Sequence, residues 1–212
     1  NSDKAAKIPA GQLWMPCLSK EEVETVFSES ALAPHRDDVF AAVTYWKNAR
    51  LVSLDSDFLN EPACPRYARD FSVGRRPGTG AMNRLYAVEG SPSITGAKAD
   101  NKLVARASQV EGIAAALAQA CGLSVQGAPT PTGTAAKWVK AAADDLKANA
   151  GSCVVVAGRW QSPLVHALAA ALNGRLNNKG KTVKYTAPVE TQSINTTDSI
   201  RRLGADMKAG KV

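Results

Sequence analysis

Acidic side chains stand where two predicted strands end, and such groups can carry acid–base or metal chemistry. Asp55 and Asp57 close the apolar run 50–55 and its turn, and Glu89 closes the run 84–89. Paired carboxylates can act as acid and base or hold a metal ion. Aspartates in such places also form turns and cap helices, so both interpretations stay open.

A glycine turn offers a second kind of chemistry. Gly158 follows the apolar run 153–157, and Ser162 and Pro163 have the residue types of a helix N-cap and first helical position. Backbone N–H groups at such a helix start can bind a phosphate, and Arg159 could add charge. A strand–glycine–helix turn also has a packing reason alone. The sequence contains neither Gly-x-Gly-x-x-Gly nor Gly-x-x-x-x-Gly-Lys-Ser/Thr, which leaves a nucleotide site without its usual motif.

Cysteines and histidines give little support to a metal centre or a hydrolase. The four cysteines are Cys17, Cys64, Cys121 and Cys153, and no two have Cys-x-x-Cys spacing. We expect the last two in the core, while the first two, in proline-flanked loops, could pair only if the fold joins them. The only histidines, His35 and His166, belong to no Ser–His–acid spacing, and both are expected to be packed or half-exposed.

Composition indicates a folded protein without a nucleic-acid footprint. The 212 residues are 45% hydrophobic, enough for one large or two small domains. The net charge of +7 is scattered and aromatic residues are only 6%, so no nucleic-acid partner is expected. We find no apolar run of membrane-spanning length and expect no signal peptide. A helical pattern ends at Gly210, two residues before the end, which predicts a domain truncated at its C-terminus.

The elements that position these residues alternate between strands and helices. We predict strands at 50–55, 84–89, 153–157 and 182–186, parallel and adjacent, with helices between them. This order predicts an α/β fold with a doubly wound, mostly parallel sheet and helices on both faces, a three-layer sandwich. We assign residues 41–212 to this Rossmann-like domain and residues 1–40 to a helical N-terminal extension. A further helical spacing joins Phe40, Val43 and Trp46. Ligands of such sheets lie beyond the carboxyl ends of the strands.

Several runs resemble one known family. The segments 51–59, 66–71, 82–89, 91–100, 155–158, 161–168 and 178–183 are similar to consecutive parts of the molybdopterin-oxidoreductase-like, iron–sulfur subunit of bacterial alternative complex III. The runs Asn83-Arg84-Leu85-Tyr86 and Ser93-Ile94-Thr95-Gly96-Ala97 are the more specific ones, since they are not generic strand or helix patterns. The resemblance covers roughly residues 45 to 212.

The resemblance implies a scaffold role. The family forms a membrane-associated complex, on the periplasmic side of the inner membrane, that oxidises quinol. Its molybdopterin-like half is thought to have lost its cofactor, and its iron–sulfur clusters are expected elsewhere in the subunit. We therefore expect a non-catalytic segment with no cofactor of its own, other subunits as partners and no direct membrane insertion. Alternatives are the molybdopterin-guanine-dinucleotide-binding part of an active molybdenum oxidoreductase and a stand-alone nucleotide-binding domain.

The resemblance also implies a remnant of a cofactor groove. The residues expected to line it are Asp55, Asp57, Glu89, Gly158, Gln161 and Ser162. The pair Arg159-Trp160 is expected to crowd it. Carboxylates on the rim would oppose a polyanion unless they are protonated or paired with Arg159.

Overall fold

A four-stranded parallel sheet forms the centre of the protein. The structure, a computed structural model, describes residues 43–44, 50–60, 65–76, 78, 82–184 and 196–211. The sheet consists of β2 (Arg50–Leu54), β3 (Arg84–Glu89), β4 (Asn101–Val104) and β5 (Cys153–Ala157), in the order β4-β3-β2-β5. All three strand pairs are parallel. The predicted doubly wound α/β fold is therefore confirmed.

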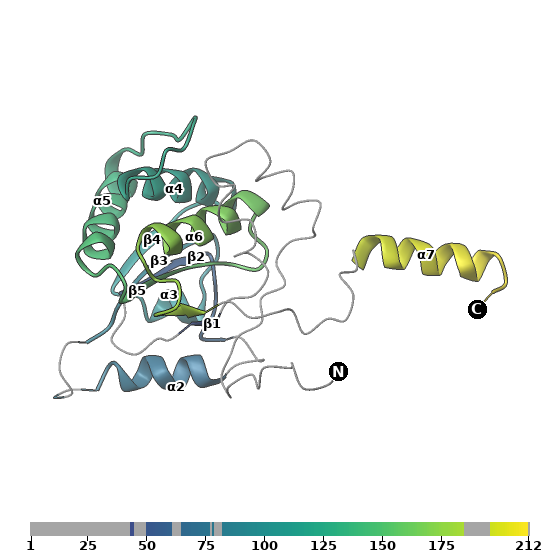
Figure 1. Cartoon of the computed structure of the whole chain (residues 1–212), viewed down its shortest axis with the longest axis horizontal. Coiled ribbons are helices and arrows are strands. Elements are labelled where there is room, and N and C mark those ends of the chain that lie inside the picture. Colours follow the sequence, from purple (N-terminus) through teal and green to yellow (C-terminus); the bar gives the residue numbers. More distant parts are fainter. Residues whose placement is uncertain are drawn as a thin grey trace.

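Helices cover both faces of this sheet (Figure 1). On one face lie α4 (Ala107–Ala120), α5 (Gly133–Ala148) and α6 (Pro163–Arg175), and α2 (Pro65–Val73) packs on the other. A one-turn helix, α3 (Ile94–Ala97), connects β3 to β4. The expected helices that fall on described residues after β2 are present as α2, α4, α5, α6 and α7 (Thr196–Lys208), whereas α3 was not predicted.

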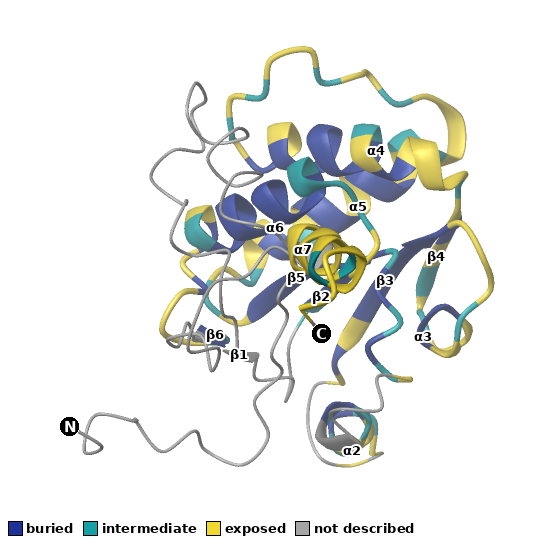
Figure 2. Ribbon diagram, turned by 90° about the vertical axis from the view of Figure 1, so that its right-hand side faces the viewer, coloured by how far each residue is buried: buried dark blue, intermediate teal, exposed yellow. Residues whose placement is uncertain are grey.

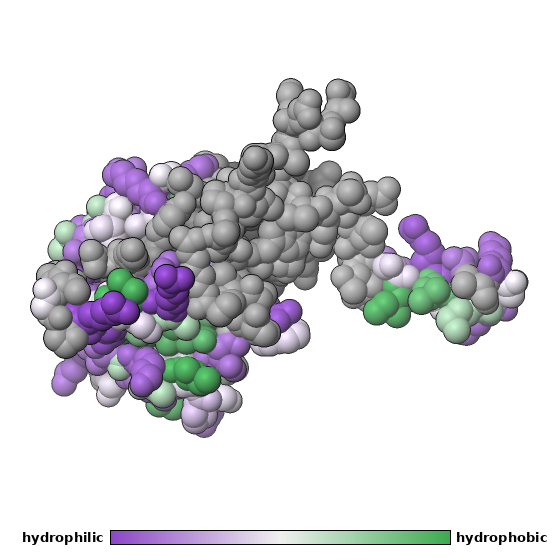
Figure 3. All heavy atoms as spheres, turned by 90° about the horizontal axis from the view of Figure 1, so that it is seen from below, coloured by the Kyte–Doolittle hydropathy of each residue, from purple (hydrophilic) through white to green (hydrophobic). Residues whose placement is uncertain are grey.

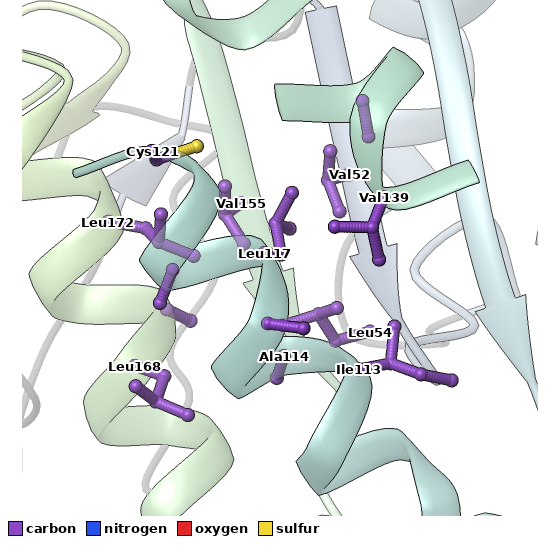
Figure 4. Close-up of a cluster of buried hydrophobic side chains, with 14 of the residues drawn as sticks. Val52, Leu54, Ile113, Ala114, Leu117, Cys121, Val139, Val155, Leu168 and Leu172 are labelled. Atoms are coloured by element: carbon purple, nitrogen blue, oxygen red, sulfur yellow. The ribbon is translucent and has the colours of Figure 1, made fainter. Parts of the chain in front are cut away.

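The two faces are built by alternation along each strand. Val52 and Val155 belong to the larger core cluster with α4, α5 and α6, while Leu51 and Val154 belong to the smaller one with α2. Successive strand residues point to opposite faces, so a strand buried on both sides reads as one apolar run. Figure 4 shows side chains of α4 and α6 pointing toward those of the strands, and Figure 2 shows the buried centre between the exposed outer surfaces.

One predicted strand lies in a different sheet from the one expected, and one strand of the main sheet was not predicted. Residues 182–186 were expected in the main sheet, but β6 (Val183–Lys184) pairs antiparallel with β1 (Val43–Thr44) in a separate two-stranded sheet. The strand at 43–44 also contradicts a helix through Val43. The fourth strand of the main sheet is instead β4, which lies beyond β3 and was not predicted. The predicted extension 1–40 lies outside the described residues.

A side chain closes the outer edge of β5. The buried amide of Asn173, on α6, accepts a hydrogen bond from the Val155 N–H at 3.0 Å and donates one to the Val155 carbonyl at 2.8 Å. The Thr182 hydroxyl donates to the Cys153 carbonyl at 2.6 Å. These bonds replace those of a neighbouring strand, which gives a physical reason why β6 is not the strand next to β5.

At the amino ends of the strands, Asp145 of α5 joins three elements. Its carboxylate accepts from the Arg50 Nε at 3.2 Å, from the Arg84 Nη1 at 2.9 Å and from the Tyr86 hydroxyl at 3.1 Å. Burial raises the pKa of Tyr86, an effect that Arg84 reduces by hydrogen bonding. Asp145 therefore fastens α5 to the starts of β2 and β3.

The last helix differs from the others in its exposure. Helix α7 (Thr196–Lys208) leaves Ile200, Leu203 and Met207 exposed by 66%, 52% and 62%. In Figure 3 its apolar side chains gather on one side and its polar ones on the other. Of the helices formed by described residues, none has the length and apolarity needed to cross a membrane.

Replacing Asn173 tests the closed edge of β5. In Asn173→Ala the buried Val155 N–H and carbonyl lose their partners, so we expect the free energy of unfolding to fall by about 2–4 kcal/mol. Urea unfolding followed by circular dichroism measures it. The control Asn60→Ala, at an exposed loop position, should stay within about 0.5 kcal/mol. Equal effects of the two changes would contradict the assignment.

Candidate functional site

The strand order puts the candidate site between β2 and β5. From β2 the chain adds β3 and β4 on one side, and β5 then lies on the other side of β2. Such a reversal separates the loops that follow the two central strands, and open α/β sheets bind ligands in this crevice. The loop after β2 begins at Asp55, and the loop after β5 begins at Gly158.

Asp55 joins the three loops at this edge. Its Oδ1 accepts a hydrogen bond from the Gly90 N–H at 3.1 Å, and its Oδ2 accepts one from the Gln161 side-chain amide at 2.7 Å. Its own N–H donates to the Val88 carbonyl at 2.8 Å. Asp55 has a φ of 57°, a left-handed conformation that aspartate tolerates better than most residues. The carboxylate is therefore used to hold loops together.

Gly158 is required by a close approach of two backbones. A Cβ atom on Gly158 would lie 2.0 Å from the Asp55 carbonyl oxygen, far inside contact distance. The Gly158 N–H donates to the Leu54 carbonyl at 2.8 Å, which continues the β2–β5 ladder by one residue. The glycine thus serves the packing of the loop against Asp55, as the simpler interpretation of the turn predicts.

Asp57 holds the start of α3. Its Oδ1 accepts from the Thr95 N–H at 2.9 Å, while the Thr95 hydroxyl accepts from the Leu59 N–H at 3.1 Å. Thr95 is fully buried. Asp57 therefore ties the loop after β2 to the loop after β3, and its carboxylate and that of Asp55 bind different partners.

Glu89 is buried at the end of β3. Ser93 donates its hydroxyl hydrogen to Glu89 Oε2 at 2.5 Å, and the Lys102 ammonium lies 2.5 Å from Oε1. A Cβ on Gly96 would lie 2.1 Å from this carboxylate, so the group packs directly against the α3 backbone. The ion pair compensates the cost of burying the charge. Lys102 belongs to β4, which explains why no sequence pattern revealed this partner.

The last two predicted residues belong to the turn before α6. Ser162 is the N-cap residue of α6, as predicted, but its hydroxyl donates to Glu111 Oε2 of α4 at 2.5 Å instead of capping α6. Gln161 binds Asp55, whereas the Arg159 guanidinium lies 5.0 Å from the centre of the Trp160 ring. Trp160 is 87% exposed, so it does not fill the crevice as we expected.

The structure thus brings the predicted residues to one edge in four separate groups. These are Asp55 with Gly158 and Gln161, Asp57 with Thr95, Glu89 with Ser93 and Lys102, and Ser162 with Glu111. In the described ranges, no three His, Cys, Asp or Glu side chains form a possible metal-binding group. The carboxylates serve as hydrogen-bond acceptors between loops rather than as a paired acid and base.

Five backbone N–H groups at this edge have protein acceptors as well. The N–H groups of Gly90, Thr95 and Gly96 donate to Asp55, Asp57 and Ser93. Those of Gly158 and Gln161 donate to carbonyl groups of Leu54 and Gly158. A phosphate or a pterin-linked nucleotide would need donors of this kind, and these five already donate within the protein.

The described cysteines do not fit a cluster either. Cys121 and Cys153 are free and buried in the core, as predicted, and Cys17 and Cys64 lie outside the described residues. Burial raises the pKa of the Cys121 thiol to about 11. His166 is buried on α6. Comparison with protein-family models and with curated proteins returns no match.

Changing Gly158 to alanine tests the close approach. The added Cβ must push apart two backbone segments, so we expect Gly158→Ala to lower the free energy of unfolding by about 1–3 kcal/mol or more. Gly204→Ala is the matched control because nothing lies within 4 Å of its added Cβ on α7. This control should be neutral or stabilise by about 0.5–1 kcal/mol. Thermal melts of both variants decide, and an unchanged melt for Gly158→Ala would refute the contact.

Alkylation tests the burial of the thiols. At pH 8 a thiol with a pKa of about 11 is ionised in about one molecule in a thousand, so native Cys121 should resist iodoacetamide. Peptide mass spectrometry should show labelling of Cys121 and Cys153 only after unfolding in guanidinium chloride. Rapid labelling of either residue in the native protein would mean that the thiol is accessible and available as a ligand.

Proposed function

We propose that the chain is a non-catalytic scaffold segment of a molybdopterin-oxidoreductase-like subunit in a quinol-oxidising electron-transfer complex. The sequence resemblance over residues 45 to 212 supplies the family, and with it the periplasmic location and the other subunits as partners. The observation that carries the non-catalytic part is the Asp55 bridge, which joins the loops after β2, β3 and β5. A cofactor between β2 and β5 would have to break this bridge.

Charge supports the same proposal. No cation pairs with Asp55 or Asp57 in the described part of the chain, and Arg159 stacks on Trp160 instead. A phosphate group would therefore meet carboxylates at the rim without a facing guanidinium. Glu89 is compensated by Lys102, which removes that cation from ligand binding too. The site thus favours loop packing over the binding of a polyanion.

A nucleotide-binding domain is the second candidate. The order β4-β3-β2-β5 supports it, since dinucleotide-binding folds place four strands in this order. The two proposals differ in one property, the ability of the crevice to bind a nucleotide while the Asp55 bridge is intact.

Calorimetry with GDP and GTP at low salt separates the proposals. For the 212-residue chain we expect no micromolar binding, because five backbone donors at the crevice already have acceptors and the carboxylates there oppose a polyanion. Asp55→Gly keeps the left-handed backbone and releases the Gly90 N–H and Gln161, so any gain in affinity should appear in this variant. The control Asp198→Gly removes an exposed carboxylate of α7 and should leave the isotherm unchanged.

Two outcomes would overturn the scaffold proposal. Micromolar binding by the unaltered chain, lost in Gly158→Val while the variant still melts cooperatively, would show a working crevice. Molybdenum with bound pterin in the native full-length subunit, found by metal analysis and absorption, would show an active molybdenum enzyme.

A further inference from the structure

Helix α7 carries an apolar stripe that the described protein does not cover. Ile200, Leu203 and Met207 are more than half exposed, and their directions fall within an arc of about 60° on the helix. Apart from the half-exposed Gly204 and Asp206, the residues described around them are exposed. Figure 3 shows the apolar side of α7 facing away from its hydrophilic side. The helix is therefore amphipathic while being polar overall.

The charges of α7 are unequal. Asp198 pairs with Arg201 at 2.9 Å, and Asp206 lies 4.0 Å from Lys211. Arg202 and Lys208 remain without an ion pair among the described residues, which leaves the segment 198–211 with four basic and two acidic side chains. On the helix these two cations emerge on opposite sides of the stripe, each more than about 100° from its centre.

We infer that α7 binds an anionic lipid surface, lying flat with its stripe toward the acyl chains. A short polar helix with an exposed apolar stripe and basic flanks has the properties of an interfacial helix, and Arg202 and Lys208 can extend to the phosphate level on both sides. This contact adds a surface attachment and does not span the membrane. It goes beyond the scaffold proposal and does not rest on it.

A second copy of the chain fits the stripe less well. Pairing two α7 helices would bring excess positive charge against excess positive charge. A stable interface needs about 1,000 Å² of buried surface, more than three side chains per helix supply. The charge complementarity therefore favours the anionic surface.

Cosedimentation of the full chain with sucrose-loaded vesicles tests the inference. We expect binding to vesicles of equal parts phosphatidylglycerol and phosphatidylcholine at low salt, loss of binding at about 0.5 M salt, and none to pure phosphatidylcholine. Leu203→Ser should weaken binding about tenfold or more, because it removes the central apolar side chain. Ala205→Ser, on the opposite side of α7, is its control and should bind as the unaltered chain does.

A charge-matched pair of variants tests the cations. Each cation near an anionic surface strengthens binding about fivefold. The double variant Arg202→Ser/Lys208→Ser should therefore weaken binding about 30-fold. Lys98→Ser/Lys137→Ser removes two exposed cations outside α7 and should have a much smaller effect. Equal losses in both double variants would overturn the inference, since binding would then follow net charge alone.

Three other results would also overturn it. The first is no binding to the anionic vesicles at low salt. The second is a concentration-dependent dimer in sedimentation velocity that Leu203→Ser abolishes, which would assign the stripe to a second copy. The third is equally tight binding to single-stranded DNA through Arg202 and Lys208, which would identify a general polyanion surface. Nucleotide titration of the crevice is unaffected by any of these results, so the two proposals fail separately.

Discussion

The contact on which the rest of the carboxyl edge depends is the approach of Gly158 to the Asp55 carbonyl. A Cβ on Gly158 would lie only 2.0 Å from that oxygen, so the backbones of the loops after β2 and β5 are in direct contact here. This fixes where Gln161 begins the turn into α6, and the Gln161 amide can then reach Asp55. Because Asp55 also accepts from the Gly90 N–H, the position of the loop after β3 depends on the same contact. One glycine and one carboxylate therefore join the loops after β2, β3 and β5 at this edge.

Acidic side chains fasten both ends of the sheet. At the amino ends Asp145 joins α5 to β2 and β3, and at the carboxyl ends Asp55, Asp57 and Glu89 join the loops. Asp145, Asp55 and Glu89 each accept from at least two partners, and Asp57 accepts from the Thr95 N–H. On the exposed helix α7, by contrast, Arg202 and Lys208 have no ion pair among the described residues.

The sequence predicted what depends on local pattern and missed what depends on distant partners. The strand 153–157 was clear because all five residues are buried, and a strand buried on both faces must be apolar throughout. β4 was missed because only Leu103 of its four residues is buried, as an edge strand allows. The run 182–186 has strand-like residues, but Asn173, a polar residue inside an apolar helix, already bonds the Val155 N–H and carbonyl at the outer edge of β5. The bond between Asp55 and Gln161 joins residues 106 positions apart, which no spacing rule can identify.

Residue types at a sheet edge do not by themselves decide between a ligand site and a packed edge. Glycines, a helix N-terminus and flanking polar residues are what a phosphate site requires, and the sequence placed them correctly here. The difference lies in which acceptors the backbone N–H groups find. Where a phosphate is bound, such N–H donors point into the crevice. In this protein the N–H groups of Gly90, Thr95 and Gly96 donate instead to side chains, those of Asp55, Asp57 and Ser93. An aspartate directly after β2 therefore supplies an acceptor within the protein, and its carboxylate joins the loops after β2, β3 and β5.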